Sequence, residues 1–163
     1  VILIDEVDKI GKGYQGDPTS ALLEVLDPEQ NMSFSDHYLD IPFDLSQVLF
    51  ICTANVIDTI PGPLLDRMEL INLSGYTTEE KMDIAKRYLL PKLMNDSGLN
   101  PEKVVFTENA LLETIKGYCR ESGVRSLKQK LEQIMRKIAV KFADGMNEKV
   151  VVDATDLAGF LGP

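Results

Sequence analysis

The sequence predicts an α/β fold in which part of a parallel β-sheet is followed by a small, mainly α-helical domain. Residues 1–4 and 48–52 form short apolar runs with the length and β-branching of buried strands, and both end abruptly in polar residues. From Gly75 onward, apolar residues recur instead with helical spacing. We therefore expect an α/β segment over residues 1–74 and a helical domain over residues 75–163.

Composition narrows the possible environments of the chain. Its 163 residues carry a formal net charge of −9, which argues against a surface for nucleic acid or anionic lipid. The two cysteines, Cys52 and Cys119, form no CxxC motif and fit a reducing compartment. No stretch approaches the roughly 20 apolar residues of a transmembrane helix, so no membrane span is expected. Because the chain starts directly on a strand pattern without methionine, we expect a segment of a longer protein.

A helix is predicted between the two apolar runs. In "GDPTSALLEVLDP", Asp17 is a suitable N-cap, Pro18 suits the first helical position, and the second proline should end the helix. A strand–helix–strand unit of this length has a right-handed crossover and parallel strands. Parallel strands end at the same edge of a sheet, where ligands bind in open α/β folds. Asp5 and Glu6 should therefore meet Asn55 at that edge.

Less regular segments flank the second strand. Residues 34–45 mix apolar and polar residues around Asp40 and predict a hairpin, although Pro42 weakens one of its strands. Residues 61–73 predict a proline-rich turn, a short helix over residues 64–67 and a third strand over residues 69–73.

The helical domain opens with a capping box formed by Thr77 and Glu80. Its first helix should reach Pro91, which kinks or restarts it. A second helix begins at Thr107 and should end at Gly123.

The longest apolar stripe runs over residues 127–142 and closes at Gly145. A short strand follows, and Thr155 should cap a last helical turn.

Four short motifs resemble those of AAA+ ATPases. "VILIDE" resembles a Walker B strand, "CTAN" a sensor 1 strand, "PLLDRME" an arginine-finger segment and "SGVRSL" the start of the sensor 2 helix in the lid. DEAD-box helicases carry a similar acidic strand, but the Ser-Ala-Thr motif expected of them is absent. The resemblance implies the C-terminal half of an AAA+ core followed by its helical lid.

Longer motifs narrow the resemblance to the Lon family of ATP-dependent serine proteases. They are "GDPTSALLEVLDPEQN", "FSDHYLD", "DRMELINLSGYT", "EKMDIAKRYLLPK" and "RESGVRSL". The run "VLFICTANVIDTIP" is more similar to the mitochondrial branch, which implies the mitochondrial matrix, with the bacterial cytoplasm as the alternative.

The Lon resemblance implies ATP and Mg²⁺ as cofactors and gives roles to three residues of the first segment. Asp5 would hold Mg²⁺ on ATP, and Glu6 would activate the attacking water. Asn55 would be sensor 1, bonded to that water or to the γ-phosphate. The alternatives are that Asp5 and Glu6 are surface acids at a strand end and that Asn55 is a turn residue, and the convergence of the three residues at one sheet edge argues against both.

Two arginines complete the implied site. Arg67 would be the finger that reaches the nucleotide of a neighbouring subunit, and Arg125 would be sensor 2, contacting the phosphates from the lid. A finger that acts in trans implies a homo-oligomeric ring, here a hexamer. Without the resemblance, Arg67 forms a solvated ion pair beside Asp66 and Glu69, and Arg125 simply starts a helix.

Two further residues have competing interpretations. Tyr14 lies in a glycine-flanked loop suited to gripping an unfolded polypeptide in a central pore, and equally suits an exposed loop without function. His37 is the only histidine, which excludes a multi-histidine metal site, and we interpret it as structural.

Two motifs of a complete ATP-dependent protease are missing. No GxxxxGK[ST] loop occurs, so the phosphate-binding loop should lie upstream. Ser126 and Lys128 fall on the predicted helix surface and do not form a Ser-Lys protease site, which should lie beyond the lid. A sheet without its first strands would also leave apolar surface bare.

The sequence therefore favours a segment of the ATPase module of a Lon-type protease. The parent protein would couple ATP hydrolysis to unfolding and translocation of unfolded or damaged proteins for degradation, while the segment alone should be inactive. One alternative is an AAA+ motor acting on nucleic acid, which the acidic balance disfavours. Another, for the isolated chain, is a helical interaction module without catalysis.

Overall fold

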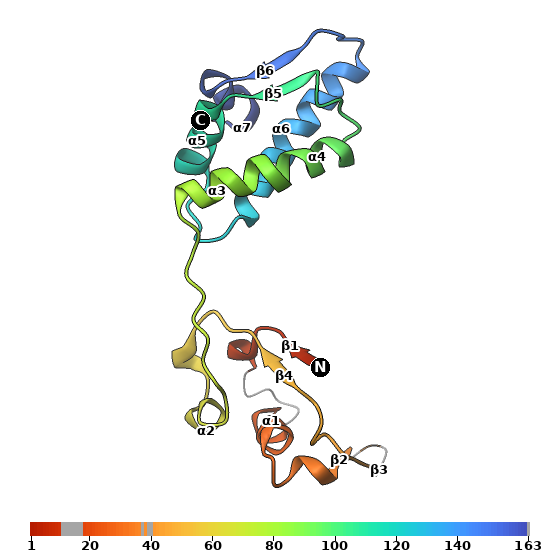
Figure 1. Cartoon of the computed structure of the whole chain (residues 1–163), viewed down its shortest axis with the longest axis vertical. Coiled ribbons are helices and arrows are strands. Elements are labelled where there is room, and N and C mark those ends of the chain that lie inside the picture. The colour runs from red at the N-terminus through yellow and green to blue at the C-terminus, as the bar shows by residue number, and fades with distance from the viewer. Residues whose placement is uncertain (11–17, 37, 39–40, 163) are drawn as a thin grey trace. The chain divides into compact units, whose positions relative to one another are not determined.

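Strands β1 (Ile2–Ile4) and β4 (Phe50–Cys52) run side by side and parallel in a computed structural model that describes residues 1–10, 18–36, 38 and 41–162 (Figure 1). Helix α1 (Pro18–Leu26) lies between them in the chain, which confirms the predicted strand–helix–strand order. Ile4 pairs with Cys52, so both strands end at the same edge. The expected N-cap Asp17 lies outside the described residues.

The described residues divide into two units, Val1–Asn72 and Leu73–Pro163. Each unit has its own apolar core. The core of the first unit is small: Val7, Ile60 and Leu64 are buried, with partly buried side chains from α1 packed against them.

The predicted hairpin is present in the connection between α1 and β4. Strand β2 (Phe34–Asp36) follows the short 3₁₀ turn η2 (Asn31–Ser33) and pairs antiparallel with β3 (Ile41–Phe43). Pro42 lies in β3 opposite Ser35 and is exposed. The hairpin forms a separate two-stranded sheet and does not extend the β1–β4 pair.

The predicted third strand over residues 69–73 is wrong. After the 3₁₀ turn η3 (Ile57–Thr59) and helix α2 (Gly62–Leu65), residues 69–77 contain no strand. Leu73 is 91% exposed, so no element among the described residues buries the apolar side chains of this segment. Strand propensity alone does not form a strand without a neighbour that accepts its backbone hydrogen bonds.

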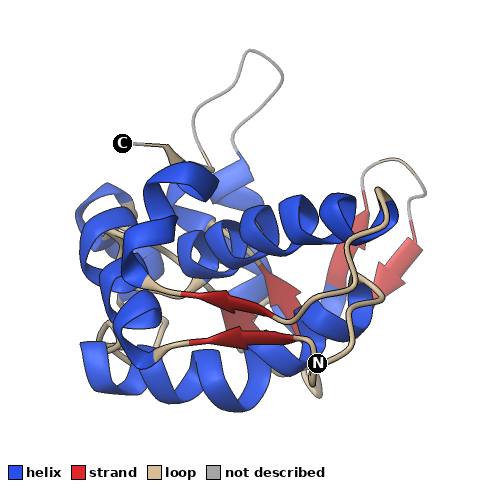
Figure 2. Ribbon diagram, turned by 90° about the horizontal axis from the view of Figure 1, so that it is seen from above, coloured by secondary structure: helices blue, strands red, loops and turns tan. Residues whose placement is uncertain are grey.

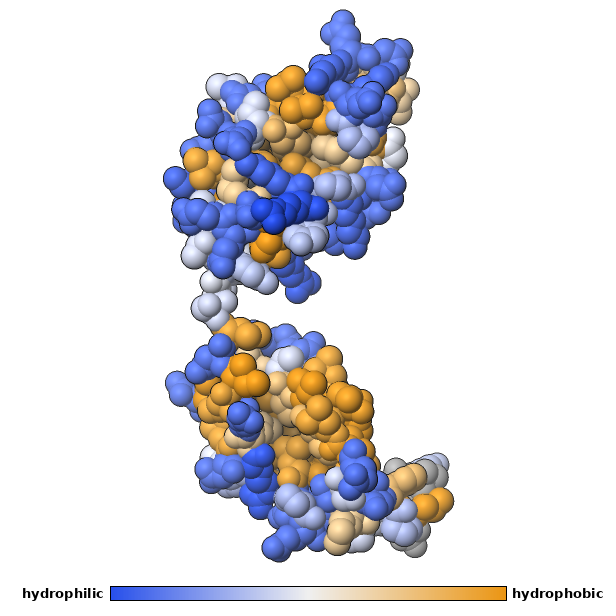
Figure 3. Space-filling model, in the orientation of Figure 1, coloured by the Kyte–Doolittle hydropathy of each residue, from blue (hydrophilic) through white to orange (hydrophobic). Residues whose placement is uncertain are grey.

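Apolar side chains gather on one face of the first unit (Figure 3). The exposed members on and beside β1 and β4 are Val1, Ile2, Leu3, Leu49 and Ile51. A contiguous exposed apolar patch marks a contact surface, because soluble proteins rarely leave one uncovered. The bare surface expected of a sheet without its first strands is therefore observed on this pair.

Helix α3 (Thr78–Ile84) opens the second unit with the predicted capping box. Thr77 accepts a hydrogen bond from the Glu80 N–H, and the Glu80 side chain accepts one from the Thr77 N–H. The helix continues through a π-helical stretch, η4 (Ala85–Leu89), into α4 (Leu90–Asp96). Pro91 lies in the first turn of α4, directly after the π-helical stretch, so the helix runs on past the proline at which we expected it to kink or restart.

A second parallel strand pair completes this unit. Strands β5 (Val104–Phe106) and β6 (Val150–Val152) lie next to each other and run in the same direction (Figures 1 and 2). Helix α5 (Glu108–Glu113) follows β5 and is capped by Thr107, as predicted. Its π-helical continuation η5 (Thr114–Tyr118) ends before Cys119, so the predicted end at Gly123 is wrong.

Helix α6 (Arg125–Ala143) provides the centre of the second core. Its fully buried side chains are Leu127, Leu131, Ile134, Met135 and Ile138. Each such side chain contributes roughly 1.5–3 kcal/mol through removal from water. Gly145, at φ 98°, follows the helix end as predicted, in a backbone conformation that disfavours other residues.

The chain closes with the 3₁₀ turn η6 (Ala154–Asp156) and helix α7 (Leu157–Leu161). Asp153 caps this segment, and its N–H in turn donates to Asp156 Oδ2 at 2.9 Å. The predicted cap at Thr155 is therefore wrong, because Thr155 lies inside η6 and the N-cap position of that turn is Asp153.

Candidate functional site

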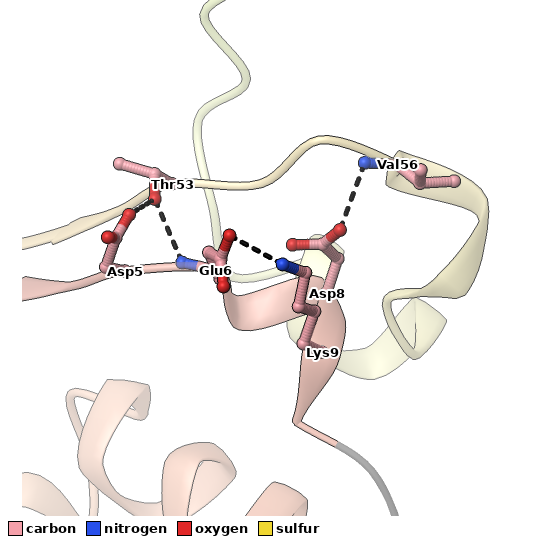
Figure 4. Close-up of polar contacts among 6 residues, drawn as sticks. All are labelled: Asp5, Glu6, Asp8, Lys9, Thr53 and Val56. Atoms are coloured by element: carbon pink, nitrogen blue, oxygen red, sulfur yellow. Dashed lines mark hydrogen bonds and ion pairs between the residues drawn. The ribbon is translucent and has the colours of Figure 1, made fainter.

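Thr53 connects the two polar segments that follow β1 and β4 (Figure 4). Its hydroxyl donates to Asp5 Oδ1 and accepts from the Glu6 N–H, with an N···O distance of 3.0 Å. Its backbone continues the parallel ladder, since Thr53 N–H donates to Ile4 O and Val7 N–H donates to Thr53 O, both at 2.9 Å. The carboxylate of Asp5 and the backbone of Glu6 are thus fixed at the edge of the strand pair.

Glu6 has a strained backbone. It is the only non-glycine residue with positive φ among the residues that the structure describes, at φ 55° and ψ 46°. This left-handed conformation costs an ordinary residue roughly 1 kcal/mol and concentrates at functional sites. Glu6 Oε1 accepts from Lys9 Nζ at 2.6 Å, and this hydrogen bond raises the pKa of Lys9 above its ordinary value.

Asp8 links the same two segments from a more buried position. Its Oδ2 accepts from the Val56 N–H at 3.3 Å, and its backbone carbonyl accepts from Thr59 Oγ1 at 3.3 Å. Its Oδ1 is buried and has no hydrogen-bond partner among the described residues. Asp8 therefore holds the segment after β4 against the segment after β1.

Asn55 lies in this connected segment, between Thr53 and Val56, and is exposed. Its side chain makes no hydrogen bond within the described part of the chain. The structure thus brings Asn55 to the same edge as Asp5 and Glu6 and leaves its amide available to a ligand.

Arg67 follows α2 and turns back across it. Its Nη1 donates to Pro63 O at 2.9 Å, and its Nη2 forms an ion pair with Asp27 Oδ2 at 3.2 Å. The alternative interpretation placed an ion pair beside Asp66 and Glu69, but the partner is Asp27, which follows α1. About a third of the Arg67 side chain, 34%, is exposed.

The carboxylate of Asp27 accepts hydrogen bonds from several donors. The Glu29 N–H, at 3.0 Å, is the main reason why the pKa of Asp27 lies below its ordinary value, and the Arg67 hydrogen bond is the next. Gln30 Nε2 also donates to it at 2.9 Å. The ionised carboxylate is thus favoured by neutral donors as well as by Arg67.

Arg125 belongs to the second unit, where it is the first residue of α6 and is exposed. Glu121 caps this helix: its Oε1 accepts from the N–H groups of Ser126 and, at 3.3 Å, Leu127. Buried Lys81 of α3 donates from Nζ to the backbone carbonyl of Glu121. The turn that leads to Arg125 is therefore held by a carboxylate and an ammonium group.

The segment that enters the second unit contacts the same turn. Tyr76 N–H donates to Ser122 O at 2.9 Å. A Cβ on Gly75 would lie 2.7 Å from Ser122 Cβ, so no other residue fits without displacement. Glu121 and Ser122 therefore join the entry to this unit, α3 and the start of α6.

Two residues that the sequence analysis singled out, Tyr14 as a pore-loop residue and His37 as a structural residue, lie outside the described residues. Within the described ranges, no group of three His, Cys, Asp or Glu side chains is arranged to hold a metal ion. No helix of the described chain is long and apolar enough to cross a membrane.

Comparison with known proteins accounts for both units. Residues 1–76 match the family described as "ATPase family associated with various cellular activities (AAA)", and residues 95–151 match the "Lon protease AAA+ ATPase lid domain". The mitochondrial Lon protease homolog of Drosophila melanogaster is 60% identical over 162 residues, which cover 99% of this chain. The chain belongs to the Lon protease family.

Other Lon proteins match over comparable lengths. Lon protease 2 of Hydrogenovibrio crunogenus is 57% identical over 99% of this chain. The chain spans 16% of the fly protein and 18% of the bacterial one. A solved structure, that of the Bacillus subtilis Lon protease SSD domain, matches with a TM-score of 0.45 and 37% identity, over 55% of this chain and 94% of that chain.

Sequence reasoning missed three residues that organise this Lon segment. Thr53, Asp27 and Glu121 provide, respectively, the hydroxyl between the acids, the partner of Arg67 and the cap of the Arg125 helix. A threonine directly after a strand was a usable signal for the first. The contact of Asp27 with Arg67 joins residues 40 positions apart, and that of Glu121 with Ser126 joins residues 5 positions apart. No periodic pattern in the sequence indicates either contact.

Proposed function

We propose that this chain is a segment of the ATPase module of a Lon-type ATP-dependent protease, in which residues 1–74 are the C-terminal half of the ATPase core and residues 75–163 are the lid. The parent protein would couple ATP hydrolysis to unfolding and translocation of proteins for degradation. The observation that carries the proposal is the edge of β1 and β4, where Thr53 fixes Asp5 and the strained Glu6 beside each other.

Asp5 and Glu6 have different surroundings that suit different tasks. Asp5 uses one carboxylate oxygen for the Thr53 hydroxyl, and its other oxygen suits the hydrated Mg²⁺ that accompanies ATP. Bound Mg²⁺ would neutralise charge on the phosphates. Glu6 is exposed, and within the described residues its side chain hydrogen-bonds to Lys9 alone, so its carboxylate can accept a proton from an attacking water.

Three further residues complete the proposed site. Asn55 acts as sensor 1, since its amide is exposed at the same edge and free to orient the water or the γ-phosphate. Arg67 acts as the finger in a neighbouring subunit's site, for which it must leave the partly exposed Asp27. Arg125 acts as sensor 2 from the start of α6, where its exposed guanidinium can contact the phosphates.

The remaining assignments follow from the same proposal. A finger that acts in trans requires a homo-oligomeric ring, for which we propose a hexamer, and Tyr14 is proposed as a pore-loop contact to unfolded substrates. Mitochondrial Lon homologues from Drosophila melanogaster and Homo sapiens support the mitochondrial matrix as the compartment, while bacterial relatives support the bacterial cytoplasm as the alternative.

The acids are tested in the full-length protein by Glu6→Gln. The variant should retain ATP binding and lose turnover at least about a hundredfold, since the glutamine cannot take a proton from water. Glu69→Gln, at another exposed acid of the same unit, should keep wild-type turnover. Equal turnover of Glu6→Gln and wild type would refute the role of Glu6.

The finger is tested by mixing subunits. Arg67→Ala and Glu6→Gln subunits should each be inactive alone and recover partial turnover when mixed, because a Glu6 site can then receive Arg67 from its neighbour. No recovery in mixed rings would contradict the trans role.

The nucleic-acid motor is the weaker candidate. The net charge of −9 argues against this candidate, since a phosphate backbone favours a protein with an excess of positive charge. Stimulation of ATP turnover by an unfolded protein, and not by duplex DNA, would separate the two.

A further inference from the structure

A groove lined by lysines lies in the second unit, away from Arg125 and its capping turn. It has a volume of about 610 Å³ and lies between the C-terminal half of α6, strand β6 and helix α7. The residues that matter for the argument are Lys137, Lys141, Lys149, Val151, Asp156 and Phe160.

The charges in this groove are unbalanced. Lys137 Nζ donates to Gly159 O at 3.2 Å, and Lys141 Nζ lies 5.2 Å from the centre of the Phe160 ring. Each ammonium group still has N–H donors for a ligand, since it carries three. The lining carboxylate, Asp156, already accepts the Asp153 N–H in the cap of the last helix. The groove lining therefore carries three positive charges, from the lysines, and one negative charge, from Asp156. This local excess of positive charge stands in a chain whose net charge is −9.

The groove also contains an unpaired strand edge. Val150 N–H donates to Lys103 O at 2.8 Å, and Val152 O accepts from Thr107 N–H at 3.0 Å, so these two residues face β5. In a parallel ladder the residue between them directs its N–H and C=O to the opposite side. Val151 is 51% exposed, and no strand pairs with its outer edge within the described part of the chain.

We propose that this groove binds an extended, acidic segment of a partner protein, which adds as a short strand to the outer edge of β6. The backbone of the segment would exchange hydrogen bonds with Val151, and its carboxylates would meet Lys137, Lys141 and Lys149. This is the recognition of a peptide by strand addition, in which the main chain supplies affinity and the side chains supply specificity.

The geometry favours a polypeptide over a nucleic acid. Single-stranded nucleic acid binds through bases stacked on exposed aromatic rings. The aromatic ring of this groove, Phe160, is buried, and Lys141 lies over it. A phosphodiester backbone also has no N–H to donate to the Val151 carbonyl, whereas an extended peptide has one at every second residue.

The test measures binding of a fluorescein-labelled octapeptide of alternating glutamate and valine to the full 163-residue chain by anisotropy. In one variant Lys137, Lys141 and Lys149 are changed to Gln. A control with the same net charge changes three exposed lysines outside the groove, Lys92, Lys116 and Lys128, to Gln. Circular dichroism checks that both variants fold.

The groove variant should bind the peptide at least about tenfold more weakly, since each exposed charge contact contributes up to about 1 kcal/mol. The control variant should bind within about twofold of wild type. Equal weakening in both variants would overturn the proposal, because binding would then follow overall charge.

Strand addition is tested on the ligand, which leaves the protein unchanged. The same octapeptide with its alternate amides N-methylated loses the donors that a strand edge requires, and should bind at least about fivefold more weakly. Unchanged affinity would overturn pairing with Val151. Tighter binding of an eight-nucleotide single strand, lost in the groove variant, would overturn the assignment to a protein partner.

Discussion

Thr53 and Asp5 are joined by a hydrogen bond that crosses between two parallel strands. The Thr53 hydroxyl donates to Asp5 Oδ1 and in the same position accepts from the Glu6 N–H. One side chain thereby fixes the carboxylate proposed for Mg²⁺ and the backbone of the carboxylate proposed for the water. The two acids differ in freedom as a result, since Asp5 is held by Thr53 and Glu6 extends into solvent.

Thr53→Val tests this link with a side chain of nearly the same shape. The change leaves Asp5 Oδ1 and the Glu6 N–H without their protein partner, which should lower the free energy of unfolding by about 1 kcal/mol. In the full-length protein it should also lower ATP turnover, because Asp5 is no longer oriented. Denaturant unfolding and a turnover assay measure the two effects. Thr53→Ser, which keeps the hydroxyl, should restore most of both, and an equally impaired serine variant would show that the methyl group matters instead.

Glu6→Gly should separate stability from function. Glycine adopts the left-handed backbone of position 6 without strain, so the variant should be more stable than wild type by about 0.5–1 kcal/mol while losing turnover. The exposed ion pair with Lys9 contributes little against this gain. Glu69→Gly serves as the control, because Glu69 has no positive φ and the change should be destabilising there. A Glu6→Gly protein that unfolds more easily than wild type would contradict this account of the strain.

Local patterns explain which elements could be predicted from the sequence. The β1–α1–β4 order, the Thr77 capping box and the buried stripe of α6 depend on residues within one or two turns of each other. Strand β5 went unpredicted because it has only three residues and pairs with β6, which lies 46 residues away in the register Val104 to Val150. The prediction of a strand over residues 69–73 was wrong for the converse reason, since no described strand lies beside this apolar segment.

In the candidate site, too, the features set by local sequence patterns could be predicted and the long-range side-chain contacts could not. The edge that unites Asp5 and Glu6 with the Asn55 segment follows from strand direction alone. The hydroxyl of Thr53 and the carboxylate of Asp27 act across 48 and 40 residues, and their roles depend on side-chain directions that no spacing encodes.

Asp27 should make the stability of the first unit depend on pH. Its pKa in the folded chain lies below the ordinary value of 3.8, first because of the Glu29 N–H and then because of Arg67. The ionised carboxylate therefore stabilises the fold above pH 3.8, and this contribution is lost as the pH falls through the lower folded pKa. Asp27→Asn should be less stable than wild type near neutral pH, and the difference should shrink under acid. Arg67→Ala should remove only the smaller part of this pH dependence. A difference that grows as the pH falls would have the wrong sign.

Glu121 should determine the order of the helix start that carries Arg125. Its carboxylate accepts two N–H groups of α6, whose N-cap residue Val124 provides no side-chain cap. Glu121→Ala should therefore lower the free energy of unfolding of the second unit by about 1 kcal/mol, as loss of a helix cap does. In the full-length protein it should raise the KM for ATP if Arg125 contacts the phosphates. Glu121→Gln, which keeps an acceptor oxygen, should give a KM and a stability between those of wild type and Glu121→Ala.

Glu132→Ala is the control for this prediction. It removes an exposed carboxylate on the same helix, paired with Lys128 at 3.3 Å, and should lower the free energy of unfolding by less than about 0.5 kcal/mol and leave KM unchanged. If Glu121→Ala and Glu132→Ala behaved alike in both measurements, Glu121 would have no special part in holding Arg125.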